Sequence, residues 1–320
     1  MSAFFFPKLL NFATITHMLW QTFGFENIKK YFERAVAGDS LEHAYLFSGQ
    51  EMIGKRTLAL ELGSRLTVQE AQWVQFLVLA SKTKTMYPES LLATNPDLLI
   101  LGNEKVGIDQ VRQLKNFLSL KPYAARYKVA IIDNAHEMGA EAANAMLKVL
   151  EEPPPHSLII LISANPKALL PTIYSRCLEI KFAPHPRNEL LKYLERLDLS
   201  KAQAEFLTDF SNGRLGLAYR LKENNTFKNI KKNLEEFSQL LKSNLNDRFK
   251  FAEKVLAGED GTEQVANLLL YWMFYLRSDF SKKLKINRAK VLKSLLITRQ
   301  ILSHPQFNHR LALENLLINI

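Results

Sequence analysis

The sequence is poor in the features that mark secreted, zinc-clustered and membrane-spanning proteins. Its 320 residues include one cysteine, Cys177, which excludes an internal disulfide and a cysteine-rich zinc site and suits a reducing cytoplasm. The longest apolar block, Val265–Leu276, is shorter than the roughly 20 residues that a membrane-spanning helix needs, so we expect a buried helix there. Internal repeats and low-complexity stretches are also lacking. We therefore expect a globular cytoplasmic protein without a membrane partner.

Positive charge is concentrated in the C-terminal part of the chain. The formal net charge is +10 at pH 7, and residues 185–320 carry 23 Lys and Arg against 15 Asp and Glu. Residues 1–184 carry 19 against 17. A basic region is typical either of a protein that meets nucleic acid or of a well-solvated helical surface, and charge alone leaves both open.

The first 183 residues alternate between short apolar runs and helix-like segments. This pattern predicts a parallel β-sheet with helices on both faces. The predicted strands cover residues 44–48, 97–101, 128–133 and 158–163, and Asp109 is the predicted N-cap of the helix after the second. From Ala183 onwards every periodic segment is helical, so we expect an α/β domain over 18–183 and helical domains over 184–224 and 225–320. Residues 1–17 form an N-terminal extension of uncertain status.

The segment SGQEMIGKRT resembles a phosphate-binding loop of the form G-x-x-x-x-G-K-[ST], placed as required between a strand and a helix. Gly49, Gly54 and Lys55 match the residues that cradle and reach the phosphates. Arg56 stands where a hydroxyl would bind Mg²⁺, and it has no acceptor atom. Thr57 carries a hydroxyl one residue later, about 100° further round a helix. The segment permits ATP or ADP binding but predicts a damaged magnesium site.

A second nucleotide-site signal follows the third predicted strand in KVAIIDNAH. Asp133 suits a magnesium-binding acid, but its neighbour is Asn134, which cannot act as a general base. His136 and Glu137 are substitutes only by proximity, and a solvated loop position is the commoner role for such residues. The changes at Arg56 and Asn134 both predict that this chain does not hydrolyse ATP.

A third signal is Arg176 in the tripeptide SRC, just beyond the fourth predicted strand. An arginine there is either an ordinary surface residue or one that reaches the γ-phosphate held by a neighbouring subunit. In the second role it would stabilise the charge that develops during phosphoryl transfer.

Four segments closely resemble the bacterial clamp-loader family of AAA+ proteins: HAYLFSG, TNPDLLIL, ANAMLKVLEEPP and TIYSRC. The likeness runs from about Phe23 to the C-terminus, where NHRLALENLL resembles the end of the family's helical collar. It implies an AAA+ α/β domain, a small helical lid and an all-α collar. Within the family, the altered nucleotide motifs resemble the non-hydrolysing member of the ring rather than the motor subunits.

The resemblance also implies partners and a role. These are the gamma/tau and delta subunits of the DNA polymerase III clamp loader, the sliding clamp, and primed DNA met through the assembled complex. By position, Arg176 matches the finger that enters a neighbouring motor subunit's ATP site. Gly216 stands where motor subunits have a sensing arginine, with Arg214 two residues away. Many relatives carry a four-cysteine zinc module, but residues 64–94 lack cysteine, so no zinc or other metal and no required cofactor are expected.

Three functions remain open from the sequence. The first is a non-hydrolysing clamp-loader subunit that acts through Arg176. The second is an active ATPase of the gamma/tau kind, with Thr57 and His136 or Glu137 replacing the usual groups. The third is an independent DNA-binding module. Arg112 and Lys115 match a family region that lines the DNA chamber, and contact with phosphates and a solvated surface are equally open for them.

Overall fold

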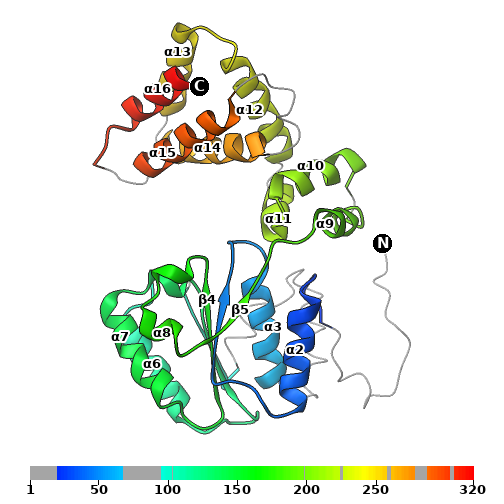
Figure 1. The fold of residues 1–320 in the computed structure, drawn as a ribbon, viewed down its shortest axis with the longest axis vertical. Coiled ribbons are helices and arrows are strands. Elements are labelled where there is room, and N and C mark those ends of the chain that lie inside the picture. Colours follow the sequence, from blue (N-terminus) through cyan, green and yellow to red (C-terminus); the bar gives the residue numbers. More distant parts are fainter. Residues whose placement is uncertain are drawn as a thin grey trace. The chain divides into compact units, whose positions relative to one another are not determined.

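The computed structural model describes most of the chain as two compact units that divide between Pro184 and His185 (Figure 1). The described residues are 20–67, 95–102, 104–197, 199–223, 226–257, 261–277, 287–302 and 306–320. The predicted extension over 1–17, and most of the segment expected to be free of zinc, lie outside them. The predicted boundary at residue 224, inside the second unit, stays a prediction.

The first unit is built on a five-stranded sheet in which all neighbouring strands are parallel, in the order β2-β3-β4-β1-β5. The three central strands are buried at every position, which explains why they are apolar runs without alternation. The strands are β1 (Ala44–Ser48), β2 (Leu98–Leu101), β3 (Lys128–Ile132), β4 (Ser157–Ser163) and β5 (Leu178–Lys181).

Helices cover both faces of this sheet, as predicted (Figure 1). On one face, α2 (Glu26–Ala37) and α3 (Lys55–Thr67) pack on a core that includes Phe32, Phe47 and Leu58. On the other, α6 (Ile108–Ser119), α7 (Ala140–Glu151) and the short α8 (Pro171–Tyr174) enclose a second core. Short 3-10 turns, η1 (Ala135–Glu137) and η2 (Pro166–Ala168), follow β3 and β4.

The second unit is helical in all of its described residues, as the sequence predicted. Its helices are α9 (Arg187–Leu194), α10 (Lys201–Ser211), α11 (Leu215–Glu223), α12 (Thr226–Leu240), α13 (Leu245–Leu256), α14 (Gly261–Arg277), α15 (Arg288–Leu302) and α16 (His309–Asn319). The apolar block inside α14 is a buried helix, as predicted: Val265, Leu269 and Trp272 are at most 1% exposed. Among the described helices, none combines the length and the apolar character needed to cross a bilayer.

Arg248 on α13 joins two helix ends inside the second unit. Its side chain is buried and donates hydrogen bonds to the carbonyl oxygens of Leu240 and Leu241 at the end of α12, and of Leu317 and Ile320 at the end of α16. Carbonyls at a helix end have no donor within the helix, and the guanidinium supplies donors to them. The Leu240 carbonyl oxygen also accepts from the Ser243 backbone N–H and hydroxyl.

The structure corrects two local predictions. The sequence pattern indicated four strands, but a fifth, β5, pairs with β1 in parallel. The N-cap of α6 is Gly107 rather than Asp109, which lies inside the first turn. The backbone N–H of Gly107 donates to the Gln110 side chain at 2.8 Å. The prediction used only the preference for aspartate at helix N-caps, which does not account for this bond.

Candidate functional site

The phosphate-type loop joins the carboxyl end of β1 to the first turn of α3. Gly49 and Gly54 both have positive φ, at 146° and 111°, which side chains rarely adopt. A Cβ at Gly49 would lie 2.5 Å from the carbonyl oxygen of Phe182, which follows β5. The two glycines therefore match the loop pattern for a physical reason: the backbone turns sharply and passes close to the neighbouring strand.

Lys55 is turned onto its own loop. Its Nζ donates to the carbonyl oxygens of Gly49 at 2.5 Å and Gln50 at 2.6 Å, and the residue is 5% exposed. Burial lowers the pKa of Lys55 from 10.5 to about 8, although the negative charges of Asp133 and Glu51 oppose the shift. The amine thus satisfies backbone acceptors in a partly desolvated position.

Arg56 pairs with Asp133, the residue expected to bind magnesium. The Arg56 Nη1 to Asp133 Oδ2 distance is 2.7 Å, with the side chains 30% and 15% exposed. Both positions where a phosphate-loop enzyme places magnesium ligands are therefore joined in one ion pair. A guanidinium supplies no oxygen ligand, and it neutralises the only carboxylate of the pair. In this arrangement the two residues do not fit a magnesium site.

The residues that the sequence offered as substitutes lie in the turn after β3 and on α3. Asn134 is exposed in the left-handed region (φ 49°), and its backbone N–H donates to Asp133 Oδ1. His136 lies in η1 with Nδ1 buried and unbonded, and Glu137 is exposed. Thr57 is half-buried on α3, while the contact to Asp133 comes from the preceding residue.

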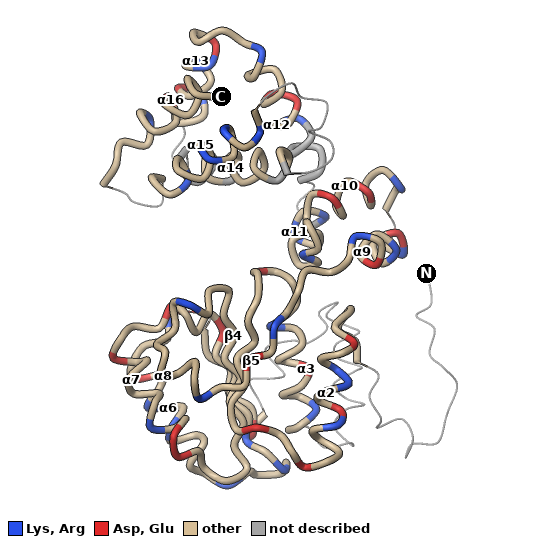
Figure 2. Tube along the Cα trace, in the orientation of Figure 1, with Lys and Arg blue, Asp and Glu red and all other residues tan. Residues whose placement is uncertain are grey.

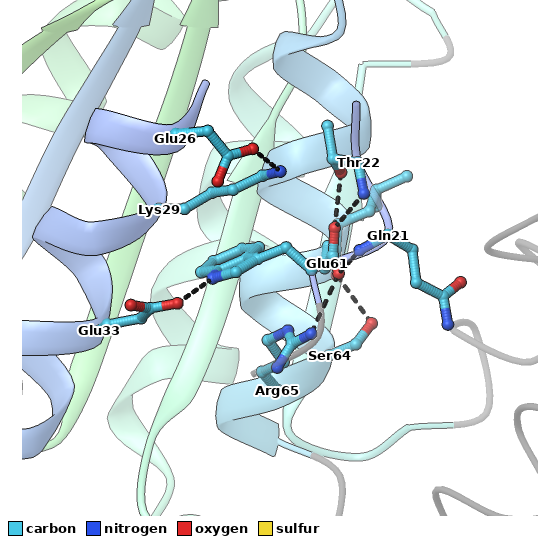
Figure 3. A network of polar contacts seen from close by, with 10 residues as sticks. Gln21, Thr22, Glu26, Lys29, Glu33, Glu61, Ser64 and Arg65 are labelled. Carbon is cyan, nitrogen blue, oxygen red and sulfur yellow. Dashed lines mark hydrogen bonds and ion pairs between the residues drawn. The ribbon is translucent and has the colours of Figure 1, made fainter. Parts of the chain in front are cut away.

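The segment before α2 is tied to α3, the helix that follows the phosphate-type loop (Figure 3). Glu61 on α3 is fully buried, and its carboxylate accepts hydrogen bonds from the backbone N–H groups of Gln21 and Thr22 and from the Thr22 hydroxyl. Arg65 pairs with the same carboxylate at 3.2 Å and lies over the Trp20 ring. This network fixes the chain's entry into the first unit against the helix that carries Lys55.

Arg176 lies in the turn between α8 and β5. Its Nη2 contacts Glu151 Oε1 at 2.7 Å, and its Nη1 donates to the carbonyl oxygen of Thr172 at 2.8 Å. The side chain is 34% exposed and that of Glu151 is 49% exposed, so solvent screens the pair and its contribution to stability is small. Arg176 is therefore at the surface and is held by weak contacts.

Two acidic residues around Arg176 were missed from the sequence. Glu151 ends α7 within the LEEPP segment, and Glu179 on β5 bonds Tyr174 two residues before the arginine. Two consecutive glutamates, Glu151 and Glu152, end the helix of the ANAMLKVLEEPP segment, and this pair could have indicated an acidic partner for Arg176. Nothing in the sequence pointed to Glu179, because its strand was not predicted.

The proposed DNA-contacting residues stay predictions. Arg112 on α6 is exposed and pairs with Asp109 at 2.9 Å, and Lys115 lies one turn further along. Figure 2 shows basic residues on elements of both units, and α15 carries four basic residues and no acidic one. In the second unit, Gly216 lies on α11 and the Nε of Arg214 donates to the Ser211 carbonyl oxygen.

The fold and the loop define the class of this protein. The sheet is parallel in the order β2-β3-β4-β1-β5, the phosphate-type loop follows β1, and helices cover both faces. With its helical second unit, the chain is an AAA+ protein, as predicted. The loop residues of that class are present, and its magnesium-binding pair is replaced by the Arg56–Asp133 ion pair.

Comparison with known proteins places the chain within that class. Residues 24–186 match the family model described as "DNA polymerase III, delta subunit". The chain is 25% identical to DNA polymerase III subunit gamma of Buchnera aphidicola, over 92% of this chain and 78% of that protein. It is 38% identical to DNA polymerase III subunit delta' of Pseudomonas aeruginosa, over 43% of this chain and 42% of that protein.

A solved structure of a gamma subunit-related protein from Thermotoga maritima aligns with 90% of this chain and 97% of its own length, at 21% identity and a TM-score of 0.49. Several curated relatives are much longer than their aligned parts, and the chain spans less than half of their length. The chain belongs to the DNA polymerase III delta subunit family, a clamp-loader family of AAA+ proteins, and its matched relatives are named as delta', gamma and tau subunits.

Proposed function

We propose that the chain is the delta-prime subunit of the DNA polymerase III clamp loader, a rigid member that does not hydrolyse ATP. The observation that carries this proposal is the Arg56–Asp133 ion pair at 2.7 Å. It turns the two residues that would bind magnesium into a neutral pair, and Asn134 stands where a base would be needed. The Lys55 bonds to its own loop support the same conclusion.

In this proposal Arg176 acts in trans. It is at the surface on a short turn, and its contacts to Glu151 and Thr172 are weak enough to be exchanged for a stronger anion. A guanidinium delivered to a developing phosphoryl transition state is worth about 10³–10⁵ in rate in related NTPases. The chain would thus assemble with motor subunits of the gamma/tau kind and with a delta subunit, and would help them to load a sliding clamp onto primed DNA.

The absence of hydrolysis is tested on the purified chain alone. Phosphate release from ATP and Mg²⁺ should equal the background, and Lys55→Ala should not change it. A gamma/tau motor subunit measured in parallel shows that the assay works. Magnesium-dependent release that Lys55→Ala abolishes would refute the non-hydrolysing role and make the chain an ATPase.

The role of Arg176 is tested in the reconstituted loader. Arg176→Ala should leave the stoichiometry of the complex intact while lowering its ATP turnover, because the group that stabilises the transition state is lost. Arg126→Ala is the matched control, since Arg126 is a surface arginine of the same unit that also pairs with one carboxylate, that of Asp39. Equal turnover in the two variants would remove the finger role from the proposal.

A further inference from the structure

Glu179 joins the strand that leads into the phosphate-type loop to the helix that precedes Arg176. The Ser48 hydroxyl donates to Glu179 Oε1 at 2.6 Å, and the Tyr174 hydroxyl donates to Oε2 at 2.6 Å. Ser48 is the last residue of β1, and Tyr174 is the last residue of α8. One carboxylate therefore connects two segments that lie more than a hundred residues apart in the chain.

The bridging carboxylate is largely buried, while Tyr174, whose hydroxyl bonds it, is 41% exposed. The Glu179 side chain is 16% exposed, and both of its oxygens accept a hydroxyl hydrogen. Burial by itself would raise the pKa of Glu179, but the hydrogen bonds from Ser48 and Tyr174 and the charge of Lys181 hold it below its ordinary value. The group is ionised at neutral pH, the state in which it accepts both bonds.

The phosphate-type loop is a firm anchor at the Ser48 end. Ser48 is buried, and its carbonyl oxygen accepts the backbone N–H of Phe182 at 2.8 Å. The next residue, Gly49, donates its N–H to Ser163 at the end of β4. The entrance of the loop is thus bonded to the strands on both sides, and Lys55 closes the loop from within. These contacts are internal to the chain.

The Arg176 turn needs an anchor of this kind. Helix α8 has four residues, too short to be stable from its own hydrogen bonds. Ile173 holds it to the sheet by burial, and the backbone N–H of Arg176 bonds the Ile173 carbonyl oxygen at 3.1 Å. The Tyr174 hydroxyl supplies the polar attachment on the side of β5. Because Tyr174 precedes Arg176 by two residues, movement of one moves the other.

We propose that Glu179 is a positioning residue for Arg176, anchored through Ser48 at the end of β1, where the phosphate-type loop begins. This rests on the proposed function of Arg176 in trans. Ser48 is fixed by its pairing with β4 and β5 at the entrance of the loop. It holds the Glu179 carboxylate, which in turn holds the Tyr174 hydroxyl and the turn that follows. A fixed turn presents the guanidinium to a neighbouring subunit at small entropic cost.

Two single-group deletions test the proposal, Tyr174→Phe and Ser48→Ala. Each variant removes one of the two hydroxyl groups that donate to the Glu179 carboxylate. The tyrosine ring and the backbone of β1 stay in place. Lys181→Met is the matched control, because Lys181 contacts the same carboxylate at 3.5 Å from a side chain that is 80% exposed. Amide hydrogen exchange in the isolated chain should become faster at Arg176 and Cys177 in both deletions, and stay unchanged in the control.

In the reconstituted loader, Tyr174→Phe should lower the kcat of ATP hydrolysis per assembled complex roughly 2- to 10-fold, the range expected for one hydrogen bond. The KM for ATP should not change, because the finger contributes in the transition state. In an Arg176→Ala background the same deletion should cause no further loss, since its effect passes through the arginine. A purely structural role would reduce the amount of complex and leave the kcat per complex unchanged.

Unchanged exchange at Arg176, or unchanged kcat in Tyr174→Phe while Arg176→Ala lowers turnover, would overturn the role of Glu179 and leave the finger standing. A loss of kcat that persists in the Arg176→Ala background would overturn it as well. If Arg176→Ala itself has no effect on turnover, the finger and its positioning residue fall together.

Discussion

The perturbed lysine of the phosphate-type loop gives a prediction that can be worked out from the structure. Lys55 has a pKa of about 8 in the folded chain because it is buried, against 10.5 for an ordinary lysine. Below about pH 8 the amine is protonated in both the folded and the unfolded chain. Between about pH 8 and 10.5 the folded chain has lost this proton while the unfolded chain still binds it. The free energy of unfolding therefore rises with pH in that window.

The size of the effect follows from the two pKa values. From about pH 7 to about pH 9.5, Lys55 should add about 2 kcal/mol to the free energy of unfolding of the first unit. Lys55→Met removes the titrating group and should lack this rise. The difference between the two proteins isolates Lys55 from tyrosines such as Tyr45 and Tyr127, whose raised pKa values lower stability as pH increases beyond about 10.

The assay is urea unfolding at several pH values. Amide hydrogen exchange in β1 (Ala44–Ser48) detects the unfolding, so that the signal comes from the first unit alone. Parallel pH profiles for the natural chain and Lys55→Met would refute the buried, internally bonded lysine. The same titration with ADP or ATP tests the loop further. A phosphate beside the amine would raise the pKa of Lys55 and flatten the rise, whereas an unchanged profile would mean that the loop does not hold nucleotide.

Two further predictions concern the buried polar networks. Arg248→Met should lower the free energy of unfolding of the second unit by about 3 kcal/mol, because buried carbonyls at two helix ends lose a charged donor. Urea unfolding measures this change. The control is Arg310→Met, which removes an exposed ion pair on α16 and should leave stability almost unchanged. Glu61→Gln should destabilise the first unit by about 1–3 kcal/mol and speed amide exchange at Thr22, since an amide group then faces backbone donors. Equal stability of Glu61→Gln and the exposed Glu137→Gln would contradict this.

Local sequence patterns predicted the elements that are governed by local rules. The central strands are apolar runs because both of their faces are covered, and the glycines of the loop are required by positive φ. The pattern failed at β5, where LEIK alternates charged with apolar residues on a half-exposed strand. It failed again at Asp109, because a side chain three residues after Gly107 caps the helix instead.

The sequence by itself determined the fold class, the family resemblance and the presence of Arg56 and Asn134 where the motifs have a hydroxyl and an acid, since each depends on residue types at fixed spacing. Only the tertiary structure decided where those altered residues point. Arg56 and Asp133 are 77 positions apart, and their pairing needs α3 and β3 to meet. Glu151 and Glu179 reach the neighbourhood of Arg176 from a helix and a strand in the same way. Such contacts join distant positions through folding, which spacing along the chain does not encode.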